Sequence, residues 1–166
     1  MHVFSYLQCS PELMIPDPDD SVYLSRSDVN EPLSSYSKHG FELDGHFWPS
    51  VEHYFQGMKF ENPAHQEKVR QADHPSKARR LGRSRFRRVR RDWSKVRRVI
   101  MTRAVYTKCR AHPELAERLL ETGDLPIVEN SQYDYFWGCG RDLRGHNTYG
   151  KVLMDVRRRL REERNA

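Results

Sequence analysis

The sequence predicts one mostly helical α+β domain with a small antiparallel sheet built around a hairpin. Three observations lead to this fold class. Several segments repeat their apolar residues at the 3.6-residue period of a helix. Residues 41–48 (FELDGHFW) alternate around Asp44-Gly45, the two-residue turn of a β-hairpin. A chain of 166 residues can bury a core without disulfides, so we expect a single domain over residues 1–166.

Short apolar segments predict the remaining strands. They lie at residues 2–7 (HVFSYL), 22–25 (VYLS) and 125–130 (LPIVEN). The segment 10–20 is rich in proline and aspartate, so we expect it to be irregular.

The first helix should start at Val51, because Ser50 is a favourable N-cap and Trp48-Pro49 brings the chain in extended. Four apolar residues share one face of this helix: Val51, Tyr54, Phe55 and Met58. Three polar residues share a second face: Glu52, Gln56 and Lys59. A glutamate in the first turn and a lysine in the last also suit the helix dipole. The polar stripe is therefore either an ordinary solvated face or part of a site.

Two short helices should follow. Asn62-Pro63 precedes a helix over residues 64–72, and Ser76 is expected to cap a helix over residues 75–82 that Gly82 closes. The arginine-rich segment 85–90 is expected to be a strand or a loop.

Three longer segments complete the helical prediction. Asp92 should cap a helix that ends before His112, with one face formed by Trp93, Val96, Ile100 and Ala104. The next helix buries Leu115, Leu119 and Leu120 and stops at Gly123. After a loop over residues 131–146, Asn147 begins a last helix that should fray over residues 157–166. Its inward residues are expected to be Val152, Leu153, Val156 and Leu160.

Composition restricts the function classes. Cys9, Cys109 and Cys139 are scattered, which favours reduced thiols and a cytoplasmic location. No cysteine or histidine spacing matches a zinc site, and no apolar run is long enough for a membrane span. We therefore expect no metal, no cofactor and no membrane partner.

The formal net charge of +6 is concentrated in residues 77–103, where many arginines accompany a single acid, Asp92. Such a run is either a solvated face, a product of coding bias, or a surface for phosphates or nucleic acid.

Several residue types point to a nucleotide-processing pocket. Trp93 and Trp137 lie among polar residues, so each is either a core residue or a ring that stacks a base. Gly138 permits close backbone approach beside Trp137. Asn147 at a helix start could hold an anion or a ribose hydroxyl. Carboxylates come from Glu52, Glu129 and Asp134.

Six motifs also carry a family resemblance: residues 32–60, 75–83 (PSKARRLGR), 91–101 (RDWSKVRRVIM), 119–131 (LLETGDLPIVENS), 134–140 (DYFWGCG) and 145–157 (GHNTYGKVLMDVR). In this order they resemble the NADAR domain, the YbiA-like family, over nearly everything after residue 25. The resemblance implies an α+β fold and cleavage of N-glycosidic bonds between a ribose C1′ and nitrogen. It implies two substrate classes, phosphorylated intermediates of early riboflavin synthesis and ADP-ribose attached to guanine in nucleic acid.

The residues that match the family motifs are Glu52, Lys59, Trp93, Asp134, Trp137 and Asn147. Two positions depart from the pattern. Ser35 stands where the family usually has a side-chain amide, and Tyr149 stands where an aliphatic residue is common. Either change could alter which substrate is accepted.

Roles follow by analogy with glycoside hydrolysis. Glu52, near a helix N-terminus, is expected to be the general base or to stabilise the cation. Asp134 would be the proton donor if its aromatic neighbours raise its pKa. Lys59 would bind phosphate or, less favourably, form a Schiff base with the C1′ aldehyde of an opened ribose.

The expected substrate-binding residues are Trp93, Trp137, Asn147, Gln56, Ser35 and Gly138. The expected partner is a phosphorylated nucleotide-like molecule or ADP-ribosylated nucleic acid. The alternative from another class is a module that binds ADP-ribose, NAD or nucleic acid without cleaving it.

Overall fold

The computed structural model describes residues 20–166, so the strand expected at residues 2–7, nearly all of segment 10–20 and Cys9 lie outside the described part. Ten elements follow in order: β1 (Val22–Leu24), β2 (Phe41–Leu43), β3 (His46–Trp48), α1 (Val51–Gly57), α2 (Pro63–Arg70), α3 (Pro75–Gly82), α4 (Trp93–Ala111), α5 (Pro113–Glu121), β4 (Ile127–Glu129) and α6 (Thr148–Asn165). The predicted α+β class with a predominance of helix is confirmed.

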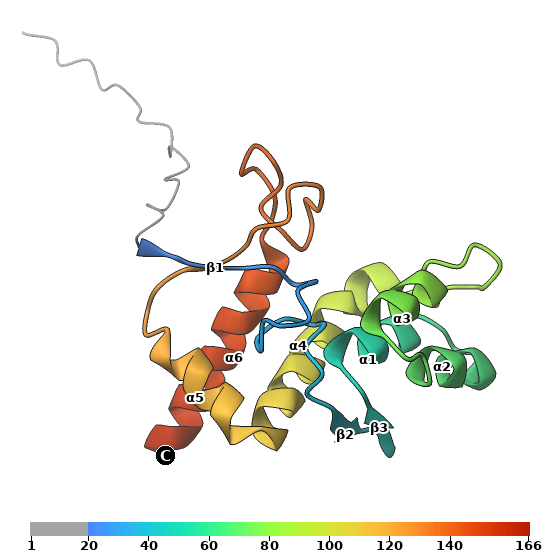
Figure 1. Cartoon of the computed structure of the whole chain (residues 1–166), viewed down its shortest axis with the longest axis horizontal. Coiled ribbons are helices and arrows are strands. Elements are labelled where there is room, and N and C mark those ends of the chain that lie inside the picture. The colour runs from blue at the N-terminus through green and yellow to red at the C-terminus, as the bar shows by residue number, and fades with distance from the viewer. Residues whose placement is uncertain (1–19) are drawn as a thin grey trace, which may run out of the picture.

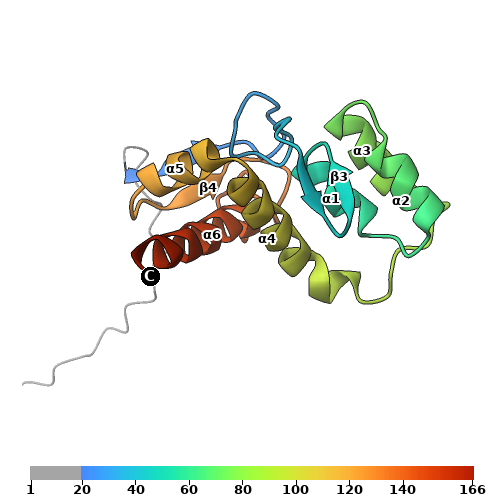
Figure 2. The same cartoon turned by 90° about the horizontal axis from the view of Figure 1, so that it is seen from below.

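The helices form two groups (Figures 1 and 2). The helices α4, α5 and α6 pack together and carry the β1–β4 pair, while α2 and α3 pack on α1. Because α1 also contacts α4, it joins the two groups. Every residue of α1 is buried, so this short helix lies at the centre of the molecule.

The local prediction for α1 is confirmed at its start. Ser50 is the N-cap, and its hydroxyl accepts a hydrogen bond from the His53 backbone N–H. The helix ends at Gly57, so Lys59 lies beyond it and does not share a helical face with Glu52 and Gln56. Those two polar side chains are buried, which excludes the interpretation of the stripe as a solvated face.

The sheet differs from the expectation in one pairing. The hairpin forms as predicted, with Phe41 opposite Trp48, and Asp44 and Gly45 both have positive φ (54° and 76°). The second pair is parallel, with Val22 opposite Ile127, so the sheet is not wholly antiparallel. A parallel pair needs a long crossover, and here the crossover includes all of α1–α5.

Three helix details correct the sequence prediction. His74, not Ser76, caps α3, because the His74 ring accepts the Ser76 N–H. Asp92 lies at the N-cap position of α4 but makes no capping bond, since its carboxylate pairs with Arg90 (Nε–Oδ1 2.6 Å). The last helix does not fray at residue 157, because Arg157 Nη1 bonds to the Thr122 hydroxyl (2.7 Å) and Leu160 is buried.

The core lies between α1, α4 and α6. The inward residues predicted for α6 are all buried: Val152, Leu153, Val156 and Leu160. The face predicted for α4 is confirmed at Ala104, which is fully buried, while Val96 and Ile100 nearer the start of α4 are half-buried. The buried residues of α4 are Met101, Ala104, Val105, Lys108 and Cys109. Within residues 20–166, no helix is long and apolar enough to cross a membrane.

Candidate active site

Glu52 in the first turn of α1 is the centre of a buried cluster of polar side chains. Its side chain is 0% exposed. Oε2 accepts from Arg26 Nη1 (3.0 Å) and lies 3.0 Å from the Ser35 hydroxyl. Oε1 accepts from Gln56 Nε2 (2.8 Å), and Arg79 Nε lies 3.8 Å away. The end of β1, the segment before β2, α1 and α3 therefore meet at one carboxylate.

Arg26, just after β1, connects this carboxylate to two others. Its Nη2 lies 3.5 Å from Asp134 Oδ2, and its backbone N–H donates to Glu129 Oε1 (3.0 Å). The guanidinium carbon lies 5.6 Å from the centroid of the Trp137 ring. A buried charge is stable only when it is paired, and Arg26 pairs with both Glu52 and Asp134. No sequence pattern pointed to Arg26, because this arginine stands alone outside the arginine run.

Asp134 is the more accessible carboxylate, with a side chain that is 27% exposed. Its Oδ1 accepts the backbone N–H groups of Phe136 (3.1 Å) and Trp137 (2.7 Å). The structure therefore brings Asp134 to the Glu52 cluster through Arg26, as the prediction of a carboxylate pair required. Its role as a proton donor stays a prediction.

The two tryptophans expected to stack a base both pack against Phe55. The ring centroid of Phe55 is 4.9 Å from that of Trp93 and 5.2 Å from that of Trp137. Trp137 is buried, with Phe55 edge-on and Arg26 over its face, whereas Trp93 is half-buried. Of the two rings, Trp93 is the one with more of its surface open to a ligand.

Lys59 reaches the same region from the turn after α1. Its Nζ donates to the Gly82 carbonyl oxygen (2.6 Å) and lies 6.0 Å from the Trp93 ring centroid. Burial lowers the pKa of the Lys59 amine from its usual value. A lysine of this kind holds its proton less tightly than an exposed one.

A second group of residues surrounds Glu129, whose carboxylate accepts the Arg26 backbone N–H. It includes Gly138 and Asn147. Glu129 is completely buried and accepts from the Ser131 hydroxyl (2.6 Å). A Cβ on Gly138 would lie 2.3 Å from Glu129 Oε2. The group that closely approaches the backbone at this glycine is therefore the Glu129 side chain. The Asn147 amide binds the backbone of β4, accepting from the Glu129 N–H (2.9 Å) and donating to the Ile127 carbonyl (2.8 Å).

Asn147 is the N-cap of α6, as predicted, but its side chain makes no capping bond. Its expected contact with a ribose or phosphate stays a prediction. The N-cap assignment could be made from local sequence, while the bonds to β4 could not, because they join residues that are 18 and 20 positions apart.

Two further basic residues, Arg79 and Lys108, contact Glu52 or the segment that carries Ser35. Arg79 Nη1 donates to the Tyr36 hydroxyl (3.3 Å), so one arginine touches both Tyr36 and Glu52. Lys108 is fully buried and its Nζ donates to the carbonyls of Pro32 and Ser34, both at 2.8 Å. These bonds fix the segment that carries Ser35. The arginine run gave a general signal for Arg79, whereas nothing in the sequence pointed to Lys108.

Comparison with known proteins identifies the family. Residues 17–161 match the model of the NADAR domain. The chain belongs to the NADAR domain family. The prediction made from the six motifs is therefore confirmed, and the cluster around Glu52 is part of a NADAR fold.

Relatives of this NADAR chain have informative names. It is 43% identical over 132 residues to N-glycosidase Npun_R5314 of Nostoc punctiforme, covering 78% of this chain and 85% of that protein. It is 34% identical over 142 residues to N-glycosidase YbiA of Escherichia coli, covering 86% and 89%. The NMR structure of E. coli YbiA superposes with a TM-score of 0.78 at 32% identity, over 91% of this chain and 92% of that one.

A third relative differs in length. The chain is 36% identical over 163 residues to riboflavin biosynthesis protein VVA0006 of Vibrio vulnificus, which covers 98% of this chain and 44% of that protein. The named relatives thus include N-glycosidases, which are hydrolases of N-glycosidic bonds, and a protein of riboflavin biosynthesis.

Proposed function

We propose that this NADAR chain is an N-glycosidase that hydrolyses the bond between a ribose C1′ and nitrogen in a phosphorylated, nucleotide-like substrate. One observation carries the proposal: Arg26 holds two carboxylates, Glu52 at 3.0 Å and Asp134 at 3.5 Å, in one site. Most enzymes that hydrolyse glycosidic bonds use two carboxyl groups that flank the anomeric carbon. The names of the N-glycosidase relatives support the same reaction.

The reaction places defined demands on the site. The C1′–N bond breaks with its electron pair leaving on nitrogen, water oxygen bonds to C1′, and one proton of that water is transferred in net terms to the departing nitrogen. The sugar becomes positively charged on the way, so a carboxylate near C1′ lowers the barrier. Glu52 is our candidate for that group, because it is fully buried and lies at the centre of the polar cluster.

Substrate access to Glu52 is proposed to depend on Arg79. The Arg79 contact at 3.8 Å is the longest of the four that surround the carboxylate, and the Arg79 side chain is 23% exposed. A substrate phosphate that binds the Arg79 guanidinium would draw it from Glu52 and open one side of Oε1 toward C1′, while Gln56 Nε2 still donates to that oxygen. Binding of the phosphate would then prepare the carboxylate for the reaction.

Lys59 and Trp93 are proposed to bind adjacent parts of the substrate, because Lys59 Nζ lies 6.0 Å from the Trp93 ring centroid. Lys59 offers a cation for a second phosphate oxygen, and Trp93 offers a half-buried ring on which a base can stack. Asp134, whose side chain is 27% exposed, is proposed to interact with the departing nitrogen group. Schiff-base formation at Lys59 is the less favoured alternative, although the lowered pKa of its amine is compatible with it.

Two substrate classes fit this proposal. Relatives that are named riboflavin biosynthesis proteins favour a phosphorylated intermediate of that synthesis. The arginine-rich segment favours ADP-ribose attached to guanine in nucleic acid, because a polyanion offers partners for many cations. The riboflavin-type substrate needs only the arginines and lysine of the cluster itself.

One observation favours a second function, binding of ADP-ribose or NAD without cleavage. Glu52 is fully buried and surrounded by four donor groups, an arrangement also expected of a carboxylate that only positions arginines. The test must therefore separate binding from turnover.

The experiment is a paired incubation with ADP-ribosyl-guanine DNA and with the phosphorylated aminopyrimidine intermediate. Released sugar and base are followed by mass spectrometry, and ligand affinity is measured by calorimetry. We expect cleavage of at least one substrate, and loss of cleavage with retained affinity in Glu52→Gln. Glu42→Gln changes an exposed glutamate on β2 and should leave both unchanged. Affinity without cleavage by the unmodified protein would contradict the enzyme proposal and favour the binding module.

A further inference from the structure

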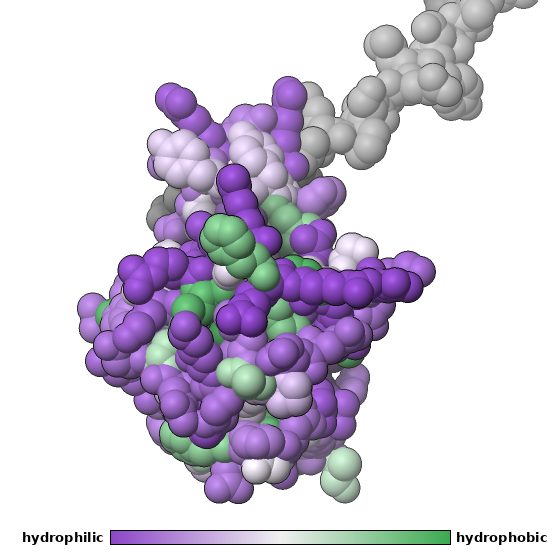
Figure 3. All heavy atoms as spheres, turned by 90° about the vertical axis from the view of Figure 1, so that its right-hand side faces the viewer, coloured by the Kyte–Doolittle hydropathy of each residue, from purple (hydrophilic) through white to green (hydrophobic). Residues whose placement is uncertain are grey.

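Residues 83–91 form a loop between α3 and α4, which we call the arginine loop. It extends from the edge of the molecule in Figure 1, beyond α3. Arg90 pairs with Asp92. The other arginines of the loop are exposed, and none has a carboxylate within 4 Å among residues 20–166: Arg83, Arg85, Arg87, Arg88 and Arg91. The face of the molecule in Figure 3, which looks onto this edge, is dominated by hydrophilic side chains.

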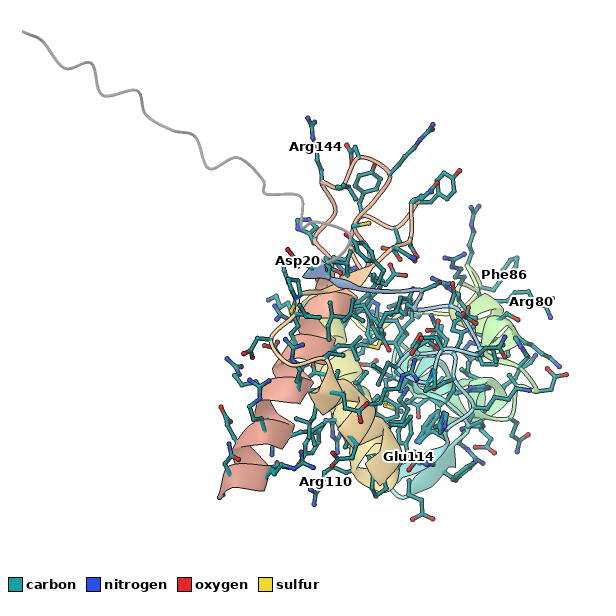
Figure 4. All side chains as sticks on the ribbon, turned by 60° about the vertical axis from the view of Figure 1, so that its left-hand side comes forward. Asp20, Arg80, Phe86, Arg110, Glu114 and Arg144 are labelled. Atoms are coloured by element: carbon teal, nitrogen blue, oxygen red, sulfur yellow. The ribbon has the colours of Figure 1, made fainter. Side chains whose placement is uncertain are left out.

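Phe86 is the exception in the arginine loop. Its side chain is 97% exposed, and arginines precede and follow it in the sequence. Figure 4 shows Phe86 on the same side of the molecule as Arg80 and far from Arg110 and Glu114. A phenyl ring in water forgoes the stabilisation that burial would give it. A ring held among unpaired guanidinium groups is suited to a ligand that offers both a flat face and negative charge.

The arginine loop is anchored on Lys59 at both ends. The Lys59 amine donates to the carbonyl of Gly82, directly before the loop, and the Lys59 carbonyl accepts the Arg90 N–H (2.8 Å). A bridge between Phe60 and Val89 adds to this attachment. The loop therefore starts and ends beside a residue of the candidate active site. A ligand that lies along the loop is led toward that site.

We propose that the arginine loop binds single-stranded nucleic acid, with its arginines on the phosphates and one base stacked on Phe86. Proteins that bind single strands combine a basic surface with aromatic rings that stack bases, because every base offers a flat face. A duplex does not offer such a face, since its bases already stack on each other. An anionic membrane is a poorer fit, because membrane-surface segments need a broader apolar face than one ring.

The proposal concerns a binding surface outside the Glu52 cluster and does not depend on which bond the protein hydrolyses. The test uses fluorescence anisotropy with a fluorescein-labelled oligothymidylate of about 12 nucleotides, within the ~4–16 nucleotides that single-strand sites cover. We expect Phe86→Ala to weaken binding at least about fivefold, from the known contribution of stacking, and Phe86→Tyr to restore it. On a duplex of equal length, Phe86→Ala should have no effect.

The arginines are tested by salt dependence. The triple variant Arg85→Ala/Arg87→Ala/Arg88→Ala should reduce the slope of log affinity against log salt by about 2, because each lost contact with a single strand removes about 0.7. The matched control Arg110→Ala/Arg158→Ala/Arg164→Ala removes the same charge from exposed positions on α4 and α6. It should leave the slope nearly unchanged.

Three results would overturn the proposal. Phe86→Ala could bind the single strand as well as the unmodified protein does. The control triple variant could lose as much affinity as the loop variant, which would indicate a diffuse effect of net charge. Phosphatidylserine vesicles could bind in a Phe86-dependent way while oligothymidylate did not, which would assign the loop to a membrane surface.

Discussion

Arg26 and Glu52 form an ion pair of 3.0 Å between side chains that are 4% and 0% exposed, and this pair joins the end of β1 to α1. Removing one member of a buried pair leaves the other charge without compensation. We expect Arg26→Met to reduce the free energy of unfolding in urea by about 3–5 kcal/mol.

The control for this variant is an exposed pair elsewhere. Arg161 and Asp124 lie 2.8 Å apart with side chains that are 43% and 92% exposed, so Arg161→Met should cost at most about 1 kcal/mol. Equal losses in the two variants would show that Arg26 does not compensate a buried charge.

The pH dependence of activity should reveal Lys59. Burial lowers the pKa of its amine, so the positive charge is lost at a lower pH than in an exposed lysine. If that charge binds the substrate phosphate, kcat/KM falls as pH rises through the lowered pKa. Lys59→Arg keeps the charge and should move this fall to higher pH. Lys95→Arg, at an exposed position on α4, should reproduce the profile of the unmodified protein.

Lys108 should make stability depend on pH in the alkaline range. Burial lowers the pKa of this lysine from 10.5 to about 8, so between these values the unfolded chain binds more protons than the folded one. The contribution of Lys108 to the free energy of unfolding therefore rises with pH from about 8 to 10.5, by at most about 3 kcal/mol.

Urea unfolding of Lys108→Met tests that sign. The variant should be less stable at neutral pH, because the carbonyls of Pro32 and Ser34 lose their donor, and it should lose the rise above pH 8. Cys109, whose pKa burial raises to about 11, contributes the opposite slope in both proteins. Identical slopes in the two proteins would mean that Lys108 titrates normally.

Gly138→Ala should damage the loop that carries Asp134 and Trp137. The new Cβ would lie 2.3 Å from Glu129 Oε2 and 2.9 Å from the Asp134 carbonyl oxygen. Glu129 is completely buried and its carboxylate is held by bonds from Arg26 and Ser131, so we expect a loss of about 1–3 kcal/mol in stability together with lower activity. Adding Glu129→Asp shortens the opposing side chain and should restore part of the stability. A thermally unchanged Gly138→Ala variant would contradict this account.

Parts of the candidate site could be predicted from the sequence. Glu52 and Gln56 were recognised from their helical spacing, and the structure joins them by a hydrogen bond of 2.8 Å. The cytoplasmic location and the roles assigned to individual residues stay predictions. The prediction that Lys59 shares a helical face with Glu52 and Gln56 is wrong, because α1 ends at Gly57 and Lys59 lies in the turn that follows.

The elements that could be predicted from the sequence are those whose stabilising bonds are local. Ser50 caps the helix that starts at the next residue by accepting a backbone N–H three positions along, and Asp44-Gly45 closes a two-residue turn. Both features depend only on residues within one short segment. Tertiary structure alone decided that β4 pairs in parallel with β1, that Arg26 joins Glu52 to Asp134, and that Lys108 is buried. These contacts join residues that are far apart in the chain. The periodicity of one segment predicts which of its faces is buried, but not which distant segment packs against its charged groups.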